Sequence, residues 1–452
     1  MKTFALPALL VLAAFAIPAP AQESWKAGFA RVKITPEQPV FMAGYASRNK
    51  PFESVHDDLY AKVLVLEDAS GKRVVMVTTD LIGFRGADAR PLREFIAAKT
   101  CAPATAVIIN SSHTHTGPAL SVSDLSSEGG GIAERTLAYT KGLNEKITTA
   151  AAEAAGKMAP AKLSWGLGVV HFVMNRREFT TDRGVILGVN ARGLADRSVP
   201  VLRIDGEDGK LRGLIYGATC HNTTLGGNNY EISGDFAGHS QRLIEEKNPG
   251  AMAMFMQGCA GDANPYPRGT HELSQQHGAE LGSEVNRVLG TKLTPVRGPL
   301  RVAWGEVALP LATTPSREQL EATAAGKSGA LVWVAQQTLA RLKRGEKLPT
   351  DYTCPVSVCQ FGDDLTLVSL SGEVVVEYVK MIEEALGPNK LWVSAYNHDV
   401  FGYLPSARVL REGGYETRGL IHGGIGLFAP DAEKVLVAKV RELAATAGRK
   451  LP

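Results

Sequence analysis

Short apolar runs rich in β-branched residues alternate with longer helical stretches along most of this chain. The strand candidates are Leu59–Leu66, Arg73–Thr79, Ala106–Ser111, Leu211–Thr219, Ala253–Gln257, Leu365–Leu370 and Leu391–Ala395. The helix candidates are Ala87–Lys99, Ala133–Lys157, Phe236–Glu246, Glu272–Leu289, Arg317–Arg344, Glu373–Leu386 and Ala432–Ala445. Strands interleaved with helices in this way predict an α/β fold.

Several of the strand candidates run directly into polar, glycine-rich clusters. These clusters are Ser111–Gly117, Cys220–Gly227, Gly258–Asn264, Ser371–Glu373 and Tyr396–Tyr403. Ligands of α/β proteins gather at the carboxyl ends of strands. We therefore expect the clusters to meet in one site at the carboxyl ends of the strands.

The N-terminus has the features of a secretory signal peptide. Lys2 precedes an apolar run from Phe4 to Ile17, and the segment closes with an Ala-x-Ala pattern at Ala21. A transmembrane anchor, the alternative, needs about 20 apolar residues and is longer than this run. We expect residues 1–21 to be removed and residues 22–452 to form a soluble protein that is secreted or periplasmic.

The charge balance argues against nucleic-acid and membrane-surface partners. The 452 residues include 49 Lys and Arg against 46 Asp and Glu, which gives a net charge of +3. Neither a basic block nor a long basic amphipathic helix is present.

The length of the chain fits two or three domains or one large α/β domain. Pro295–Pro299 is the best candidate for a seam, and an ordinary loop is the alternative.

Cysteine usage leaves the disulfide pattern open. Five is an odd number, so at least one thiol has no partner within the chain. Cys354 and Cys359 could form a local bridge, and buried free thiols are an equally reasonable interpretation. The spacing does not indicate a zinc knuckle.

His113 and His115 are the first candidates for chemistry, in the segment Ser-Ser-His-Thr-His-Thr-Gly-Pro. In an extended segment, side chains two residues apart point to the same face, so both imidazoles can enter one pocket. A neutral imidazole is a common zinc ligand, and a second one can transfer a proton or stabilise charge. Two ordinary surface histidines are the alternative.

Single residues in the other clusters also have side chains that could bind a metal or transfer a proton. His221 follows a strand candidate. Glu373 is the first residue of a helix candidate, where it could bind metal, although a role in complementing the helix dipole is the simpler interpretation. Tyr403 and Tyr415 carry phenols that could bind metal or donate a proton, although half-buried aromatics are more common.

Two aspartates in these clusters have simpler interpretations. Asp235 is predicted to be a helix N-cap or a first-turn carboxylate. Asp262, in a glycine-rich turn, could orient a ligand histidine.

Taken together and in order, several segments resemble the neutral ceramidase family, whose members hydrolyse the amide of N-acylsphingosines. The matching segments are Phe41–Ala46, Asn110–Pro118 (the Asn-x-x-His-Thr-His-x-Gly-Pro signature), Met174–Arg177, Ile232–Asp235 and Gly258–Pro265. Ordered matches across nearly the whole mature chain are more specific than any one of them. The resemblance implies an α/β fold of mixed β-sheets flanked by helices.

The resemblance also assigns roles to individual residues. The matches to the family's zinc ligands are His113, His221, Glu373 and Tyr403. The matches to residues that contact substrate and assist chemistry at the amide are His115, Arg176 and Tyr415. Two histidines and a carboxylate are a known catalytic zinc set that leaves room for water. The implied cofactor is therefore Zn²⁺.

The chain departs from the family pattern in two places. The family has serine where this chain has Asn264, so a mechanism with that hydroxyl as nucleophile is excluded; Asn264 could still bind substrate. Family members also carry an immunoglobulin-like C-terminal domain, whereas Gly423–Phe428 and Ala432–Ala445 resemble the end of the catalytic region. We therefore expect residues 22–452 to be the catalytic domain alone.

The function implied by the resemblance is zinc-dependent hydrolysis of the amide of an N-acyl lipid such as ceramide, by zinc-activated water. The partner is then a small-molecule or lipid amide. A zinc hydrolase of a different amide or ester is the first alternative. A non-catalytic exported binding protein on the same scaffold is the second.

Overall fold

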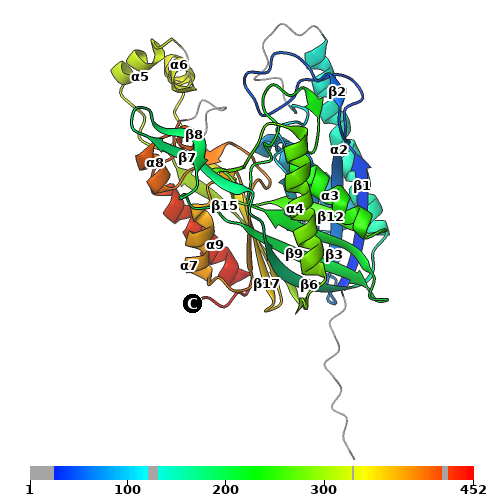
Figure 1. The fold of residues 1–452 in the computed structure, drawn as a ribbon. Coiled ribbons are helices and arrows are strands. Elements are labelled where there is room, and N and C mark those ends of the chain that lie inside the picture. Colours follow the sequence, from blue (N-terminus) through cyan, green and yellow to red (C-terminus); the bar gives the residue numbers. More distant parts are fainter. Residues whose placement is uncertain (1–24, 121–130, 328–329, 420–425) are drawn as a thin grey trace, which may run out of the picture.

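Most of the predicted strands belong to two large sheets that pack face to face between layers of helices (Figure 1). The structure is a computed structural model that describes residues 25–120, 131–327, 330–419 and 426–452. The predicted signal peptide, 1–21, lies outside these residues. Within the described ranges, no helix is long and apolar enough to cross a membrane.

The first sheet is mixed and has the strand order β12-β10-β9-β6-β1-β3-β4-β5, with β14 paired to β6. Its strands are β1 (Trp25–Lys33), β3 (Tyr60–Glu67), β4 (Arg73–Thr79), β5 (Val107–Ser111), β6 (Ala159–Val169), β9 (Ser198–Gly206), β10 (Leu211–Ala218), β12 (Met252–Gln257) and β14 (Thr294–Val296). The pairs β4–β5 and β10–β12 are parallel, and the others are antiparallel. The expected mixed sheet is confirmed.

Twist brings the two edges of the first sheet together. Seven steps separate β12 from β5 in the strand order, and a twist of about 20–25° per step turns one edge through roughly 150° relative to the other. The amide N–H of Gln257, at the end of β12, donates to Asn110 Oδ1 in β5 at 2.9 Å. Its side chain donates to the Ser112 carbonyl at 3.1 Å. The carboxyl ends of strands at opposite edges therefore meet.

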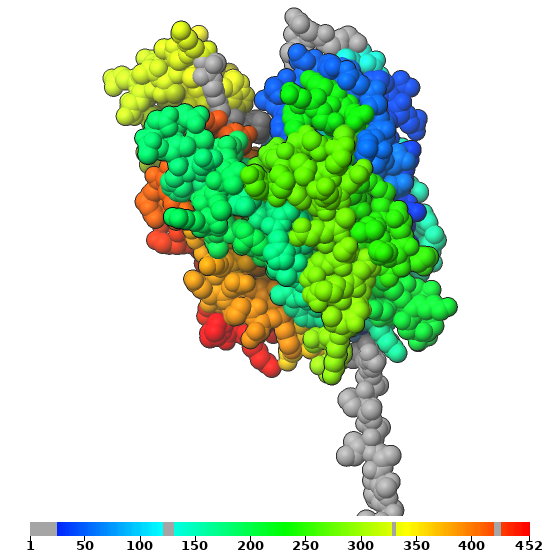
Figure 2. Space-filling model, viewed as in Figure 1, coloured from blue at the N-terminus to red at the C-terminus, as the bar shows by residue number. Residues whose placement is uncertain are grey.

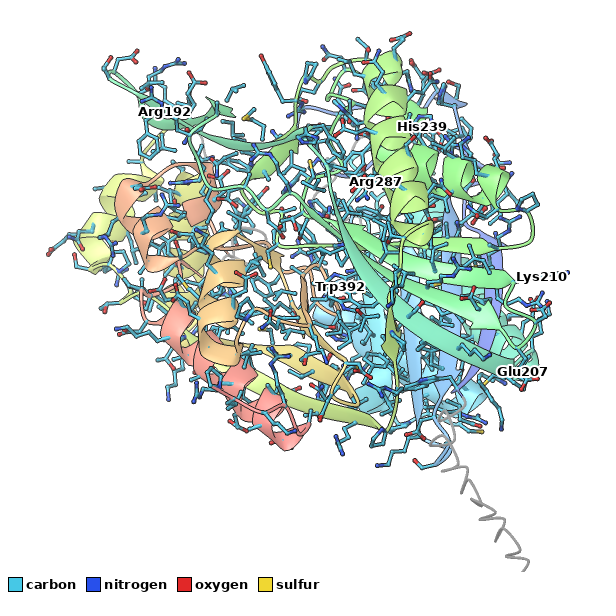
Figure 3. The ribbon with its side chains drawn as sticks, turned by 60° about the horizontal axis from the view of Figure 1, so that its bottom comes forward. Arg192, Glu207, Lys210, His239, Arg287 and Trp392 are labelled. Atoms are coloured by element: carbon cyan, nitrogen blue, oxygen red, sulfur yellow. The ribbon has the colours of Figure 1, made fainter. Side chains whose placement is uncertain are left out.

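The second sheet covers the inner face of the first. Its order is β15-β16-β17-β19, with bounds β15 (Leu300–Pro310), β16 (Asp351–Phe361), β17 (Leu365–Leu370) and β19 (Leu391–Ser394). Trp25 and Met254 of the first sheet share one buried apolar cluster with Phe361, Leu367 and Trp392 of the second. Trp392 is labelled in Figure 3, where the two sheets adjoin.

Helices cover the outer face of each sheet. The first sheet packs against α1 (Gly86–Thr100), α2 (Ile132–Gly156), α3 (Asp235–Lys247) and α4 (His271–Leu289). The second packs against α7 (Glu377–Leu386) and α9 (Ala432–Thr446). Smaller elements are β2 (Ser54–Val55), β7 (Val173–Thr180), β8 (Gly184–Asn190), β11 (Glu231–Ile232), β13 (Ala263–Pro265), β18 (Glu373–Val374), β20 (Tyr403–Leu404), α8 (Ala407–Glu412), η1 (Ala104–Ala106) and η2 (Tyr415–Thr417).

Two predicted helices have the wrong bounds. The single helix predicted for Arg317–Arg344 is a hairpin of α5 (Arg317–Ala324) and α6 (Ala330–Lys343). Gly326 follows α5, and an added Cβ there would come within 2.8 Å of Val332 Cγ2 on α6, so the two helices return close to each other. The helix predicted to begin at Glu373 begins at Glu377, because Glu373 pairs with Tyr403 in the short β18–β20 ladder.

The local disulfide considered for Cys354 and Cys359 is wrong. Both residues lie on β16, five positions apart, and side chains alternate faces along a strand. Cys354 belongs to the apolar cluster under α7 and α9, and Cys359 belongs to the cluster between the sheets. All five cysteines are free thiols.

Pro295–Pro299 is an ordinary connection and no seam. It joins β14 of the first sheet directly to β15 of the second, and residues before and after it, such as Val296 and Leu300, share one buried cluster.

Candidate active site

His113, His221 and Glu373 converge at the carboxyl ends of the strands, as predicted. His113 follows β5, His221 follows β10, and Glu373 opens β18. Glu373 Oε2 lies 3.3 Å from His113 Nε2 and 3.2 Å from His221 Nε2. The two imidazole rings are nearly perpendicular, with centroids 4.7 Å apart.

Backbone carbonyls orient both rings. Nδ1 of His113 lies 2.6 Å from the Ile82 carbonyl oxygen, and Nδ1 of His221 lies 2.6 Å from that of Ala260. A carbonyl only accepts, so each Nδ1 carries the proton and each Nε2 presents its lone pair toward Glu373. This arrangement of the outer nitrogen is typical of metal-binding histidines.

His113 is held in a left-handed backbone conformation, with φ of 60°. Its amide N–H donates to the Leu81 carbonyl at 2.9 Å, and Tyr396 packs on its ring at 4.5 Å between centroids. Non-glycine residues in this region carry strain that surrounding contacts must offset. Here the contacts direct the imidazole inward instead of along the extended direction assumed from sequence.

The donor atoms of this cluster fit a metal ion. Nε2 of both histidines and Oε2 of Glu373 are buried and have no hydrogen-bond partner among the described residues. Zinc bonds of about 2.0–2.1 Å in a tetrahedron place neighbouring ligands about 3.3–3.4 Å apart. The separations of 3.2 and 3.3 Å match that spacing before any ion is present.

His115 lies beside the same cluster. One ring nitrogen lies within 4.8 Å of donor atoms of both His113 and His221. Both of its ring nitrogens are buried without a hydrogen bond in the described chain. Gly44, with φ of 95°, backs the ring so closely that an added Cβ would lie 2.5 Å from His115 Cγ. That His115 faces substrate while His113 binds metal stays a prediction.

Arg176 connects the remaining predicted residues to the cluster. Its Nη2 donates to the Tyr403 hydroxyl at 3.0 Å, and its Nη1 donates to Asn264 Oδ1 at 3.3 Å. Tyr403 stacks on His221 with centroids 6.3 Å apart and meets Tyr415 edge-on at 5.3 Å. The structure therefore brings together all eight residues singled out from sequence.

Sequence reasoning missed Glu416. Its carboxylate is 1 % exposed and pairs with Arg176 Nε at 2.8 Å and Arg177 Nη1 at 2.7 Å. It directly follows Tyr415, and that proximity to a candidate residue was the available signal. Glu416 fixes the guanidinium of Arg176 in the plane that reaches Tyr403.

Tyr396 was also missed as a site residue, although its cluster was singled out. Its hydroxyl lies 3.4 Å from His221 Nδ1, and its ring is fully buried against both histidines. With φ of 59° it has the same left-handed backbone as His113.

The suggestion that Asp262 orients a ligand histidine is wrong. Asp262 Oδ1 accepts the Val376 N–H at 2.8 Å, and Oδ2 accepts from Asn175 Nδ2 at 3.2 Å. The carbonyl of Ala260 orients His221 instead. Asp235 is a first-turn residue of α3, as predicted, and its carboxylate accepts N–H groups from Phe236 and Leu225.

Burial and charge set the protonation of the cluster. Burial lowers the pKa of His221 to about 3, with Arg176 adding to the effect. Burial also lowers the pKa of His115 well below its usual range, so both imidazoles are neutral at pH 7. Neutral imidazoles and an ionised carboxylate are the forms that bind a divalent metal.

The face that carries these strand ends is notched between the α5–α6 hairpin and the segments around β2 (Figure 2). A separate cavity of about 960 Å³ opens between the β7–β8 hairpin and helices α7 and α8. Arg177 and Glu412 line that cavity, and the histidines do not. This cavity is therefore separate from the metal-binding atoms of His113, His221 and Glu373.

Comparisons with known proteins agree with this geometry. The family described as neutral/alkaline non-lysosomal ceramidase, N-terminal region, matches residues 25–301 of this chain. A solved structure described as ceramidase complexed with C2 is 19% identical and superposes with a TM-score of 0.72 over 94% of this chain and 75% of that chain. Neutral ceramidase from Pseudomonas aeruginosa is 20% identical, with a TM-score of 0.70 over 94% and 74%. No curated protein matches the sequence.

Proposed function

The chain belongs to the neutral/alkaline non-lysosomal ceramidase family, and on that premise we propose that it hydrolyses the amide bond of an N-acyl lipid such as ceramide. One observation carries the proposal. Two buried imidazole nitrogens lie within 3.3 Å of one buried carboxylate oxygen, and the three atoms form no hydrogen bonds to the described chain.

The residues that would hold a zinc ion are His113, His221 and Glu373, and the ring of Tyr403 stacks on His221. Zn²⁺ held there would lower the pKa of a water molecule toward 7 and polarise the carbonyl of the amide. Tyr403 is protonated at neutral pH, because burial and then the charge of Glu373 raise the pKa of its phenol.

Arg176 supplies positive charge for the oxyanion that forms when the amide is attacked. Burial opposes its charge, but Tyr403 and Glu416 more than compensate, so the pKa of its guanidinium lies well above the usual range. A fixed cation in a buried site stabilises a developing negative charge without reorganisation. Neutral His115, beside His113 and His221, can hydrogen-bond the substrate.

In this proposal Tyr415 protonates the leaving nitrogen. Its side chain is 38 % exposed and lies edge-on to Tyr403 at the outer side of the cluster. Burial raises the pKa of its phenol, so it retains its proton at neutral pH. Asn264 takes the position of the family's serine, where its carbonyl oxygen accepts from Arg176 and Thr223.

Asn264 also supports a second candidate, hydrolysis of a different amide or an ester. A side-chain amide presents an N–H₂ donor and a carbonyl in place of a small hydroxyl, which changes the hydrogen-bonding groups next to Arg176. The metal-binding residues are the same in both candidates.

We also propose export, supported by the composition of residues 1–21. Expression of the full-length chain in a bacterial host, followed by N-terminal sequencing, should give a mature protein that begins at Gln22. Recovery of uncleaved Met1 protein from the cytosol would contradict export.

A hydrolysis screen tests the function. Wild-type protein and His221→Ala are compared on ceramides of several acyl lengths, N-acyl amino acids and acyl esters, each with and without a chelator. We expect ceramide hydrolysis by the wild type alone, abolished by the chelator. His398→Ala is the matched control, since His398 is equally buried but packs on Trp304 away from the cluster. Turnover of esters or simpler amides without ceramide would favour the second candidate.

A further inference from the structure

A second histidine cluster lies outside the site described above, where β2 and β11 meet the start of α4. His56 follows β2, Glu231 opens β11, and His271 is the first residue of α4. One donor atom from each of the three lies within 4.8 Å of the other two. We propose that His56, Glu231 and His271 form a second binding site for a divalent transition metal such as Zn²⁺.

The geometry of the three side chains supports a shared ion. The rings of His56 and His271 lie with centroids 4.0 Å apart, and His271 Nε2 faces Glu231 Oε2 at 2.8 Å. This is an ion-pair distance, and the two atoms would separate by about 0.5 Å to take a zinc ion between them. Glu231 is oriented from its other oxygen, Oε1, which accepts from Ser54 Oγ at 2.8 Å. His56 is exposed, so its ring can adjust its rotamer to reach a zinc–nitrogen distance of about 2.0–2.1 Å.

Both ring nitrogens of His271 are buried. Nδ1 has no hydrogen-bond partner among the described residues, and Nε2 faces the Glu231 carboxylate. Buried polar atoms without partners are rare in folded proteins. Two imidazoles and a carboxylate are a set that Zn²⁺, Ni²⁺ or Cu²⁺ binds, and a hard cation such as Mg²⁺ would need more oxygen ligands.

Two neighbours are excluded as ligands because they already have partners. Asp57 accepts from Ser233 Oγ, the Gly234 N–H and Arg242 Nη1, at 2.7, 2.9 and 2.9 Å. His239 lies on α3 beside α4 (Figure 3), and Arg242 donates to its Nδ1. That bond leaves the His239 proton on Nε2, so this ring presents no lone pair to the cluster.

A metal at this position would fasten three separate parts of the chain. The β2–β11 pair is only two residues long on each strand, and α4 begins 40 positions after Glu231. The same region supports the histidine loop of the first cluster, because Thr114 and Thr116 donate to the Ser233 carbonyl at 3.0 and 2.7 Å. The expected role is therefore structural.

Zinc titration of the chelated protein tests the proposal. Isothermal titration calorimetry should give about two equivalents of bound zinc per chain for the wild type. It should give about one equivalent for each of the variants His271→Ala, Glu231→Gln and His113→Ala. His171→Ala is the matched control: His171 is an exposed histidine 3.6 Å from Glu280, with no second imidazole nearby among the described residues. It should retain about two equivalents.

Activity separates this site from the first. His271→Ala should keep the ceramide hydrolysis of the wild type while losing one equivalent of zinc and melting at a lower temperature when zinc is present. One equivalent in the wild type, with no change in His271→Ala, would overturn the second site. Loss of all binding in His113→Ala would also overturn it. If the protein hydrolyses no lipid but still binds two equivalents, the function proposed above fails and the second site stands.

Discussion

At the scale of single residues, the site depends on side chains whose backbone is unusual or whose partners are distant in sequence. His113 and Tyr396 have left-handed φ values and face each other across the cluster. The ordered motifs were enough to find the metal-binding candidates. Its position at the start of a helix candidate, taken alone, favoured a dipole role for Glu373. The role of Glu416 could not be predicted, because its position after Tyr415 gives no sign of a partner arginine 240 positions away.

Replacing Glu416 should slow catalysis by freeing Arg176. We expect Glu416→Gln to lower kcat by about 10- to 100-fold with little change in KM, which is the usual effect of losing a partner that orients a site residue. Glu412→Gln is the matched control, since Glu412 pairs with Arg177 and Arg408 but not Arg176. Circular dichroism at the assay temperature shows whether each variant is folded. Equal kcat in Glu416→Gln and wild type would contradict the role.

Replacing Gly44 should displace His115 and leave the metal in place. The added Cβ of Gly44→Ala would lie 2.5 Å from His115 Cγ, and positive φ adds strain of about 1–3 kcal/mol. We expect lost activity with unchanged zinc content by atomic absorption. Gly71→Ala has a similar φ of 82° with nothing within 4 Å, so it controls for backbone strain. Loss of zinc together with activity would place His115 among the metal ligands.

At the scale of elements, predictions held where an apolar run is short and buried, as for β4 and β17, which have the predicted bounds. The strands not predicted include β6 and β8, whose residues are half exposed and interrupted by Gly166, Gly168 and Gly188. Their pairing is decided by neighbours such as β9 and β7, which local sequence does not show. The meeting of β12 and β5 depends on twist summed over the sheet, which lies beyond any local pattern.

Asp262 links the turn after β12 to the start of α7, and it should make stability depend on pH. Burial raises the pKa of its carboxyl from 3.8 to about 6. The folded state therefore holds this proton more tightly than the unfolded state. The associated stability is fully present below pH ~4 and is lost as pH rises through about 6, a change of about 3 kcal/mol.

Asp262→Asn tests this directly, because asparagine has no proton to lose. Urea unfolding of chelated wild type and variant is compared at pH 4 and pH 7. We expect the variant to gain stability relative to wild type by about 3 kcal/mol between the two pH values. A difference that does not change with pH would show that the carboxyl titrates normally.

At the scale of the whole molecule, two sheets share one core, and their strand ends together build the site. Phe361 and Leu367 of the second sheet pack against Met254 of the first. Removing a large side chain from this layer should weaken both sheets together. We expect Phe361→Ala to lower the free energy of unfolding by about 3–5 kcal/mol. Val55→Ala, an exposed apolar residue, is the control and should change it by less than about 0.5 kcal/mol.

A single cooperative transition in Phe361→Ala, seen equally by tryptophan fluorescence and circular dichroism, would confirm one core. Two separated transitions would show instead that the sheets unfold independently.

The family assignment, the convergence of His113, His221 and Glu373, and the charge of Arg176 together make metal-dependent amide hydrolysis the central claim. Release of fatty acid from a short-chain ceramide by chelated protein, measured before and after zinc is restored, tests it most directly. We expect no release before zinc is added, recovery of release in the wild type after zinc is added, and no release by His221→Ala under either condition. Undiminished release by the chelated wild type, or by His221→Ala, would contradict it.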